Sequence, residues 1–179
     1  MQTEFFKRSF LNSGETEEPL DKNLGIHYNI VYMKITSPAF QSNGMIPLKY
    51  TCDGENLNPP LAFSEIPRGA KSLVLVSDDP DAPAGTWVHW IVYNISPETK
   101  ELKENNLPAG AGQGITSFGK IGYGGPCPPS GTHRYFFKLY ALDTVLQFAA
   151  SPNKADLEEA MSNHILAYAE LIGQYSRER

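Results

Sequence analysis

The sequence lacks an excess of basic residues, a membrane-spanning apolar run and a signal peptide, which mark nucleic-acid-binding, membrane and secreted proteins. Its 179 residues carry 15 Lys and Arg against 20 Asp and Glu, and this acidic balance argues against a nucleic acid as partner. No apolar run is long enough to span a bilayer, and the first residues lack the apolar core of a signal peptide. We therefore expect a cytoplasmic protein without a membrane span.

Cysteine is scarce as well. Cys52 and Cys127 are too few to define a disulfide framework, and neither lies in a C-x-x-C pair that would suggest zinc. In a reducing cytoplasm we expect both to be free thiols rather than a bridge.

The common catalytic motifs are missing too. The sequence contains no G-x-S-x-G and no H-E-x-x-H. Residues 114–120 match a phosphate-binding P-loop up to the lysine, but Ile121 replaces the required Ser or Thr, and the following Gly-Tyr-Gly-Gly-Pro cannot begin a helix. Because no nucleophile motif is evident, we expect a protein that is not an enzyme and that uses no cofactor.

The chain divides into an extension and one domain. Residues 1–30 combine an acidic middle with several structure-breaking residues, so we expect an extension that is poorly ordered or accessory. Residues 31–179 have the length and apolar content of a single domain.

Short β-prone runs dominate that domain. We expect strands at 30–36, 46–50, 73–76, 88–95, 134–142 and 171–175. A helix is predicted over 156–164, with Ser151 as its cap and Pro152 in its first turn, and we expect it to end near residue 167. Residues 105–132 hold eight glycines and four prolines, and a loop of this length is usually functional or disordered. The pattern predicts a mostly antiparallel β fold with one late helix.

Two motifs stand out, each with a rigid Pro/Gly loop beside a histidine. The first is Asp-Pro-Asp-Ala-Pro at 79–83, followed by Trp-x-His at 87–89. The second is Gly-Tyr-Gly-Gly-Pro-Cys-Pro-Pro-Ser-Gly-Thr-His-Arg-Tyr at 122–135. Proline fixes the backbone and glycine permits close approach, so such loops can hold polar groups still around a small ligand.

Together these motifs resemble the phosphatidylethanolamine-binding protein (PEBP) family, in particular its bacterial and archaeal branch related to the Raf kinase inhibitor protein (YbhB/YbcL-like). The resemblance covers about residues 33–176, and it departs from the family pattern at Asn58, where serine is usual. It implies two packed antiparallel sheets with one or two peripheral helices.

The resemblance also implies an anion-binding pocket. Its ligand-binding residues would be Asp79, His89, His133, Tyr135, Gly124, Gly125 and Pro126. Its walls and supporting residues would be Asp81, Trp87, Cys127, Pro128 and Cys52. This chemistry suits a phosphoryl or carboxylate group, because glycine N–H groups and imidazoles donate hydrogen bonds to anions and an aspartate can orient a histidine.

Structural roles compete with these assignments. Asp81 has the turn chemistry of aspartate and fits a role in stiffening the loop. His164 lies on the predicted helix without a motif partner, so we expect no role for it in the site. Trp87 and Trp90 suit a core or a pocket wall, because their large side chains are usually buried. Two histidines and two aspartates could in principle bind a metal, but the glycine-rich wall favours an anion, and we expect no metal site.

Three functions stay open at this point. The leading one is non-catalytic binding of a phosphorylated or anionic small group that resembles a phospholipid head group. The second is an inhibitor or scaffold that contacts a kinase or another protein through the pocket rim. The third is an enzyme acting on a phosphorylated metabolite, with His89 and His133 as its acid–base pair.

Overall fold

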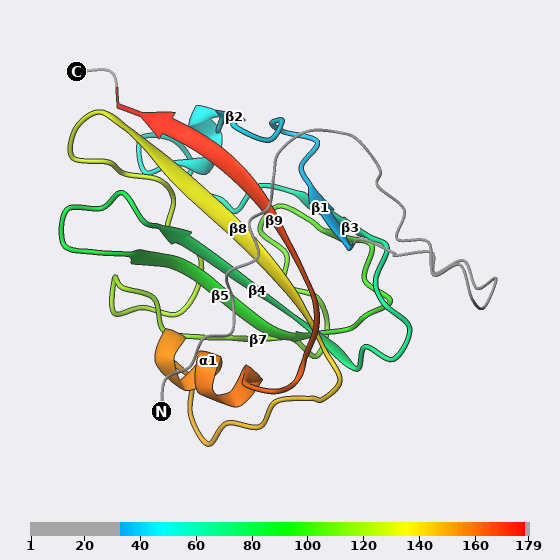
Figure 1. Ribbon diagram of the computed structural model, residues 1–179. Helices are drawn as coiled ribbons and strands as arrows, with labels where there is room; N and C mark the ends of the chain where they lie inside the picture. The colour runs from blue at the N-terminus through cyan, green and yellow to red at the C-terminus, as the bar shows by residue number, and fades with distance from the viewer. Residues whose placement is uncertain (1–32, 178–179) are drawn as a thin grey trace, which may run out of the picture. The chain divides into compact units, whose positions relative to one another are not determined.

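The computed structural model describes residues 33–177, and these belong to one compact unit. The expected extension over residues 1–30 lies outside the described residues. Two sheets make up the fold (Figure 1). The smaller sheet has the strand order β1-β3-β6, formed by Lys34–Thr36, Leu61–Ser64 and Glu101–Leu102. Its two pairings are both antiparallel.

The larger sheet has the order β2-β9-β8-β4-β5-β7. Its strands are Gly44–Met45, Ile165–Ser176, Thr132–Leu142, Ser72–Asp79, Trp87–Ile95 and Gly112–Gln113, in that spatial order. All its pairings are antiparallel except the short parallel contact of β2 with β9. The expectation of a mostly β fold with two packed sheets is confirmed.

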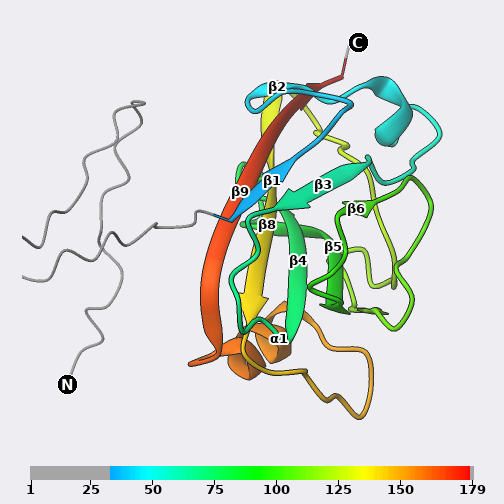
Figure 2. The same ribbon diagram turned by 90° about the vertical axis from the view of Figure 1, so that its right-hand side faces the viewer.

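The larger sheet is covered on both faces. On one face, Leu73 and Leu75 of β4 pack into a core shared with the smaller sheet, and Figure 2 shows β1 and β3 lying across the larger sheet. On the other face, Val74 and Val76 pack against the helix α1 (Lys154–Met161). Because both faces of β4 are buried, its central residues 73–76 are a continuous apolar run rather than an alternating one.

Three local predictions were wrong. The helix expected to end near residue 167 ends at Met161, and the last strand, expected over 171–175, already begins at Ile165. The segment expected as a strand over 46–50 contains instead a 3-10 helix, η1 (Leu48–Tyr50), because Pro47 precedes it and its residues make turn hydrogen bonds. The cap of α1 is Asn153 and not Ser151. The Asn153 side chain accepts from the N–H groups of Ala155 and Asp156, and the Asp156 carboxylate accepts from the N–H of Asn153, which completes a capping box.

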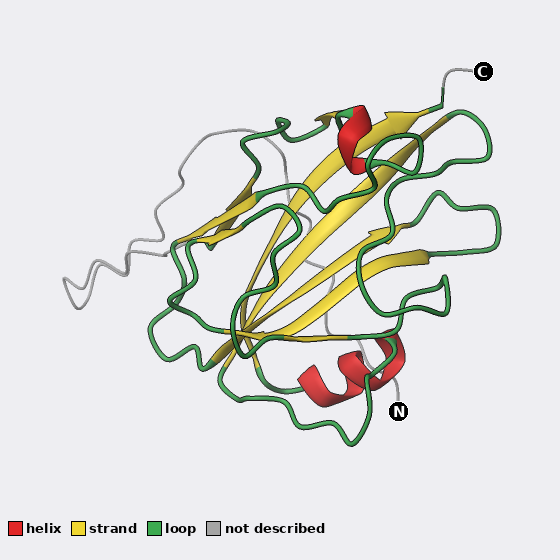
Figure 3. Cartoon of the chain, turned by 180° about the vertical axis from the view of Figure 1, so that it is seen from behind, coloured by secondary structure: helices red, strands yellow, loops and turns green. Residues whose placement is uncertain are grey.

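A buried aspartate ties α1 to the sheet. Asp78 is fully buried in β4, on the face opposite its neighbour Asp79. Lys138 Nζ lies 2.8 Å from its Oδ1, and Lys154 Nζ, from the first turn of α1, lies 2.9 Å from its Oδ2. Two cations therefore neutralise this carboxylate. Figure 3 shows α1 beside the strands, with long loops joining the other elements.

Candidate functional site

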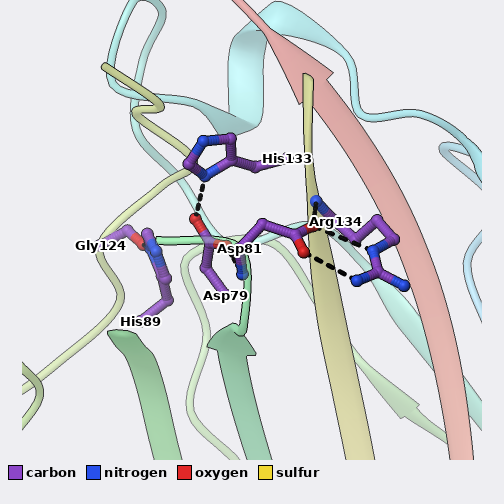
Figure 4. A network of polar contacts seen from close by, with 6 residues as sticks. All are labelled: Asp79, Asp81, His89, Gly124, His133 and Arg134. Atoms are coloured by element: carbon purple, nitrogen blue, oxygen red, sulfur yellow. Dashed lines mark hydrogen bonds and ion pairs between the residues drawn. The ribbon is translucent and has the colours of Figure 1, made fainter. Parts of the chain in front are cut away.

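The centre of the candidate site is a buried pair formed by Asp79 and His133. Asp79 ends β4, and His133 lies near the start of β8, the next strand in the sheet. His133 Nδ1 lies 2.8 Å from Asp79 Oδ2, and both residues are buried (Figure 4). Since an ionised carboxylate only accepts, Nδ1 must carry the hydrogen, and Nε2 is the ring nitrogen left for a ligand.

A second aspartate fixes the loop that follows Asp79. The backbone N–H of Asp81 donates to Asp79 Oδ1 at 2.8 Å, which closes a tight turn. The Asp81 carboxylate accepts from the backbone N–H, Nε and Nη2 of Arg134, the residue next to His133. These bonds lower the pKa of Asp81 to about 2. Asp81 is thus placed to hold the loop against β8, beside the Asp79–His133 pair.

The third polar side chain, His89, is aimed by a β-bulge. Ser77 pairs with Trp90 while the next residue, Asp78, pairs with Val88, so His89 is an extra residue in β5 without a partner in β4. Bulges re-aim side chains and are common beside functional sites. Here the bulge turns His89 toward the same region as Asp79, which adds to the electrostatic field on the ring.

The hydrogen bond of His89 decides which ring nitrogen is free. His89 Nδ1 lies 2.6 Å from the carbonyl oxygen of Gly124, so Nδ1 donates and Nε2 is left over. Burial lowers the pKa of His89 below its ordinary value, with smaller opposing contributions from Gly124 and Asp79. Near neutral pH the ring is therefore neutral, and its Nε2 accepts a hydrogen bond rather than donating one.

Tyr135 places a hydroxyl in this region without a partner. It follows His133 by two residues on the same face of β8, and its ring meets that of His89 edge to face at 5.2 Å between centroids. Its hydroxyl oxygen is buried and makes no hydrogen bond of acceptable distance and angle to any residue in the described part of the chain, although the Asp79 carboxylate and the Cys127 backbone lie close enough to act on it. Burial and the nearby Asp79 raise the pKa of Tyr135, so the group stays a donor.

The two glycines of the wall do not serve as predicted. The N–H of Gly124 donates to the carbonyl of His89 at 2.9 Å, and the N–H of Gly125 donates to Asn56 Oδ1 at 2.7 Å. The prediction that these N–H groups face an anion is wrong, because both are already used within the protein. The glycines are needed for space instead: a Cβ at Gly124 would lie 2.4 Å from the Phe118 ring, and one at Gly125 would lie 2.7 Å from the Tyr50 carbonyl oxygen.

The prediction of free thiols was also wrong. Cys52 and Cys127 form a disulfide with Cα atoms 5.4 Å apart, and the N–H of Cys52 donates to the carbonyl of Pro126. The resemblance places both cysteines at the pocket wall, on loops that approach each other, and only the expected reducing compartment favoured free thiols over the bridge. The bridge fixes the wall formed by Pro126, Cys127 and Pro128. Because disulfides persist mainly in oxidising compartments, a cytoplasmic location stays a prediction.

The sequence argument missed one aromatic residue of the site. Phe118 lies edge to face with His89 at 5.3 Å and with Trp87 at 5.4 Å between ring centroids. It is 42% exposed, so it can act as an apolar rim. Ser117 positions this turn, because its backbone N–H donates to Val88 and its hydroxyl accepts from Val88. The run Gly-Ile-Thr-Ser-Phe-Gly resembles a P-loop in its residue types, and nothing in that pattern indicates an aromatic rim.

Other predicted residues lie elsewhere. Trp90 is buried in the core between the sheets, and its Nε1 donates to Gln113. His164 bonds to the exposed Asp143, away from the motifs. Asn58 is buried and bonds to the backbone of Pro59, Lys103 and Asn105, so it has a structural role. Within residues 33–177, no three His, Cys, Asp or Glu side chains gather as metal ligands would.

Comparisons with known proteins agree with this architecture. The family model described as phosphatidylethanolamine-binding protein matches residues 36–176. The chain therefore belongs to the phosphatidylethanolamine-binding protein family. No helix among the described residues is long and apolar enough to cross a membrane.

Several relatives match over nearly their whole length. A protein named UPF0098 from Methanothermobacter thermautotrophicus is 52% identical, over 81% of this chain and 99% of its own. The crystal structure of the putative PEBP homologue CT736 from Chlamydia trachomatis has a TM-score of 0.80 and 48% identity, covering 83% of this chain and 99% of that one. Escherichia coli YbcL has a TM-score of 0.76 and 32% identity, covering 82% and 99%.

Proposed function

We propose that this domain binds a phosphorylated or otherwise anionic small group, without catalysing its conversion, at the site formed by Asp79, His89, His133 and Tyr135. The observation that supports this most directly is the buried Tyr135 hydroxyl, a donor without a partner within residues 33–177. An unpaired buried donor is costly, and an anionic oxygen would satisfy it.

The two histidines would play different parts. His133 is held by the Asp79 carboxylate, so an incoming anion would favour a protonated ring that donates from Nε2. His89 is neutral and accepts at Nε2, so it suits a ligand oxygen that carries a hydrogen. One donor and one acceptor together match a monoprotonated phosphate better than a fully ionised one.

The charge balance limits the affinity. Asp79 is buried and would repel an anion unless the proton of His133 neutralises it. Asp81 is compensated by Arg134. The site therefore gains its selectivity from hydrogen bonds rather than from a large positive charge, and we expect modest affinity for free phosphate.

Isothermal titration of the purified protein with phosphate, phosphoethanolamine and sulfate tests the proposal. His133→Ala should weaken phosphate binding by about 1.5–3 kcal/mol, the usual scale for a hydrogen bond to a charged group. Asp79→Asn should weaken it less, through loss of the ring's orientation and charge. Because His164 lies outside the site, His164→Ala is the matched control and should bind as the unmodified protein does.

Two results would count against the proposal. Unchanged phosphate affinity in the double variant His89→Ala/His133→Ala, with the fold intact by circular dichroism, would show that the histidines hold no anion. Turnover of phosphomonoesters that is lost in the same variant would favour the enzyme alternative instead.

A further inference from the structure

A second polar site lies beside the first and contains none of the four proposed anion ligands. It is a hollow of about 310 Å³, at the lower end of the range for small-molecule sites, roughly 300–1,000 Å³. Five side-chain amides line it, from Asn56, Asn58, Asn105, Asn106 and Gln113. The segment 122–125 is common to both sites, because Gly122 and Tyr123 line the hollow and Gly124 contacts His89. We propose that this hollow binds a neutral sugar or polyol of about monosaccharide size.

The orientation of Gln113 follows from its partner. The indole Nε1–H of Trp90 lies 2.7 Å from Gln113 Oε1, and an indole nitrogen can only donate. This contact fixes which end of the Gln113 amide is the oxygen, and it leaves the NH₂ group as the end with donors free for a ligand. This NH₂ has no acceptor among the described residues.

The same logic applies to Asn56. Its Oδ1 accepts the N–H of Gly125 at 2.7 Å, and a backbone N–H can only donate. Its Nδ2 has no acceptor within residues 33–177. The oxygens of Gln113 and Asn56 thus each accept a hydrogen bond from the protein, and their two NH₂ groups leave four N–H bonds for a ligand. A ligand that binds them must supply acceptor oxygens.

Asn58 and Asn105 build the frame of the hollow. Asn58 is buried, donates from Nδ2 to the carbonyls of Pro59 and Lys103, and accepts the N–H of Asn105 at Oδ1. Asn56 and Asn105 both have left-handed backbones, with φ of 59° and 47°, a conformation that asparagine tolerates better than most residues. The asparagines therefore shape the hollow as well as line it.

The lining defines the class of ligand. No residue in the described lining is charged, so an ion would lose hydration without gaining a partner of opposite charge. A sugar or polyol offers several neutral acceptor oxygens to the NH₂ groups, and its C–H surfaces can contact Leu57 and Leu107.

Two-dimensional ¹H–¹⁵N NMR of the full chain tests the proposal, with glucose and N-acetylglucosamine as probes. The chain has two tryptophans, so the Trp90 indole signal is readily assigned beside the side-chain amides. Either sugar should shift the Gln113 NH₂ and Trp90 indole signals in a saturable manner. Gln113→Glu keeps an oxygen for the Trp90 indole but removes the NH₂, and it should weaken sugar binding about tenfold.

Matched controls separate this site from the anion site. Gln174→Glu, on β9 outside the hollow, should leave sugar binding unchanged. His133→Ala should lose phosphate affinity and keep sugar affinity. The phosphate titration thus tests the anion site and the sugar titration tests the hollow, each independently of the other. Absence of a saturable shift with both sugars would overturn the inference, as would equal sugar affinity in Gln113→Glu with an unchanged fold by circular dichroism.

Discussion

Replacing Tyr135 by phenylalanine should have opposite effects on stability and on ligand binding. Its buried hydroxyl makes no hydrogen bond of good geometry among residues 33–177, so removing it relieves a desolvation cost of about 1–3 kcal/mol that only a weak attraction to the nearby Asp79 offsets. After allowing for packing changes, we expect the free energy of unfolding to rise by about 1 kcal/mol, which raises Tm by about 2–4 °C in a domain of this size. Phosphate affinity should fall about 10- to 150-fold, since a hydrogen bond to a charged acceptor contributes about 1.5–3 kcal/mol.

Tyr123→Phe is the matched control for this substitution. The Tyr123 hydroxyl donates to the carbonyl of Tyr50 at 2.9 Å, so its loss should lower the free energy of unfolding by about 1 kcal/mol and leave phosphate binding intact. Differential scanning calorimetry gives the first quantity and isothermal titration the second. If Tyr135→Phe destabilises the protein as Tyr123→Phe does, or binds phosphate unchanged, the hydroxyl is not a donor kept for a ligand.

Three further predictions concern stability and pH. Asp78→Ala should lower the free energy of unfolding by about 3 kcal/mol, because it leaves Lys138 and Lys154 without their buried carboxylate. Asp81→Ala should lower it by at most about 1 kcal/mol, because the partner Arg134 is exposed. Chemical denaturation measures both values. Reduction of the disulfide should lower stability by about 2–4 kcal/mol and weaken phosphate binding, and equal affinity with and without reductant would contradict a role for the bridge in the wall. Burial keeps the pKa of His89 in the native state below 6.5, so as pH falls below 6.5 the unfolded chain binds a proton that the native ring does not, and stability drops. The Tm of His89→Gln should therefore change less between about pH 6.5 and 5 than that of the unmodified protein. The same change of Tm with pH in both proteins would refute this.

Local signals in the sequence predicted a mostly antiparallel β fold, and the resemblance to the phosphatidylethanolamine-binding protein family predicted the two packed sheets. The β-branched and aromatic runs of β4, β5 and β8 gave strands near their observed places, and the two Pro/Gly motifs placed Asp79, His89 and His133 at the ends of adjacent strands. The helix was also found from its apolar spacing, with its start within two residues, but its end lies at Met161 and not near residue 167.

What the sequence could not show depends on contacts between distant segments. The Cys52–Cys127 bridge, the Asn56 contact to Gly125 and the two lysines on Asp78 each join residues that only the fold brings together. The bulge at His89 was equally hidden, because a shift of pairing leaves no mark in the order of residue types. These contacts decide which N–H groups are free, and they therefore corrected the predicted chemistry of Gly124 and Gly125.

The disulfide also bears on the order in which the chain can fold. It joins residues 75 positions apart, and the pairing of β4 with β8 closes a loop of similar length that overlaps it. With the bridge already formed, the chain path between β4 and β8 is roughly halved. Halving a flexible loop lowers its closure cost by only about 0.6 kcal/mol, so the bridge would speed this step about threefold at most. The reduced chain should consequently reach the same topology at a similar rate, with the β4–β5 hairpin and the β8–α1–β9 unit forming locally before they join.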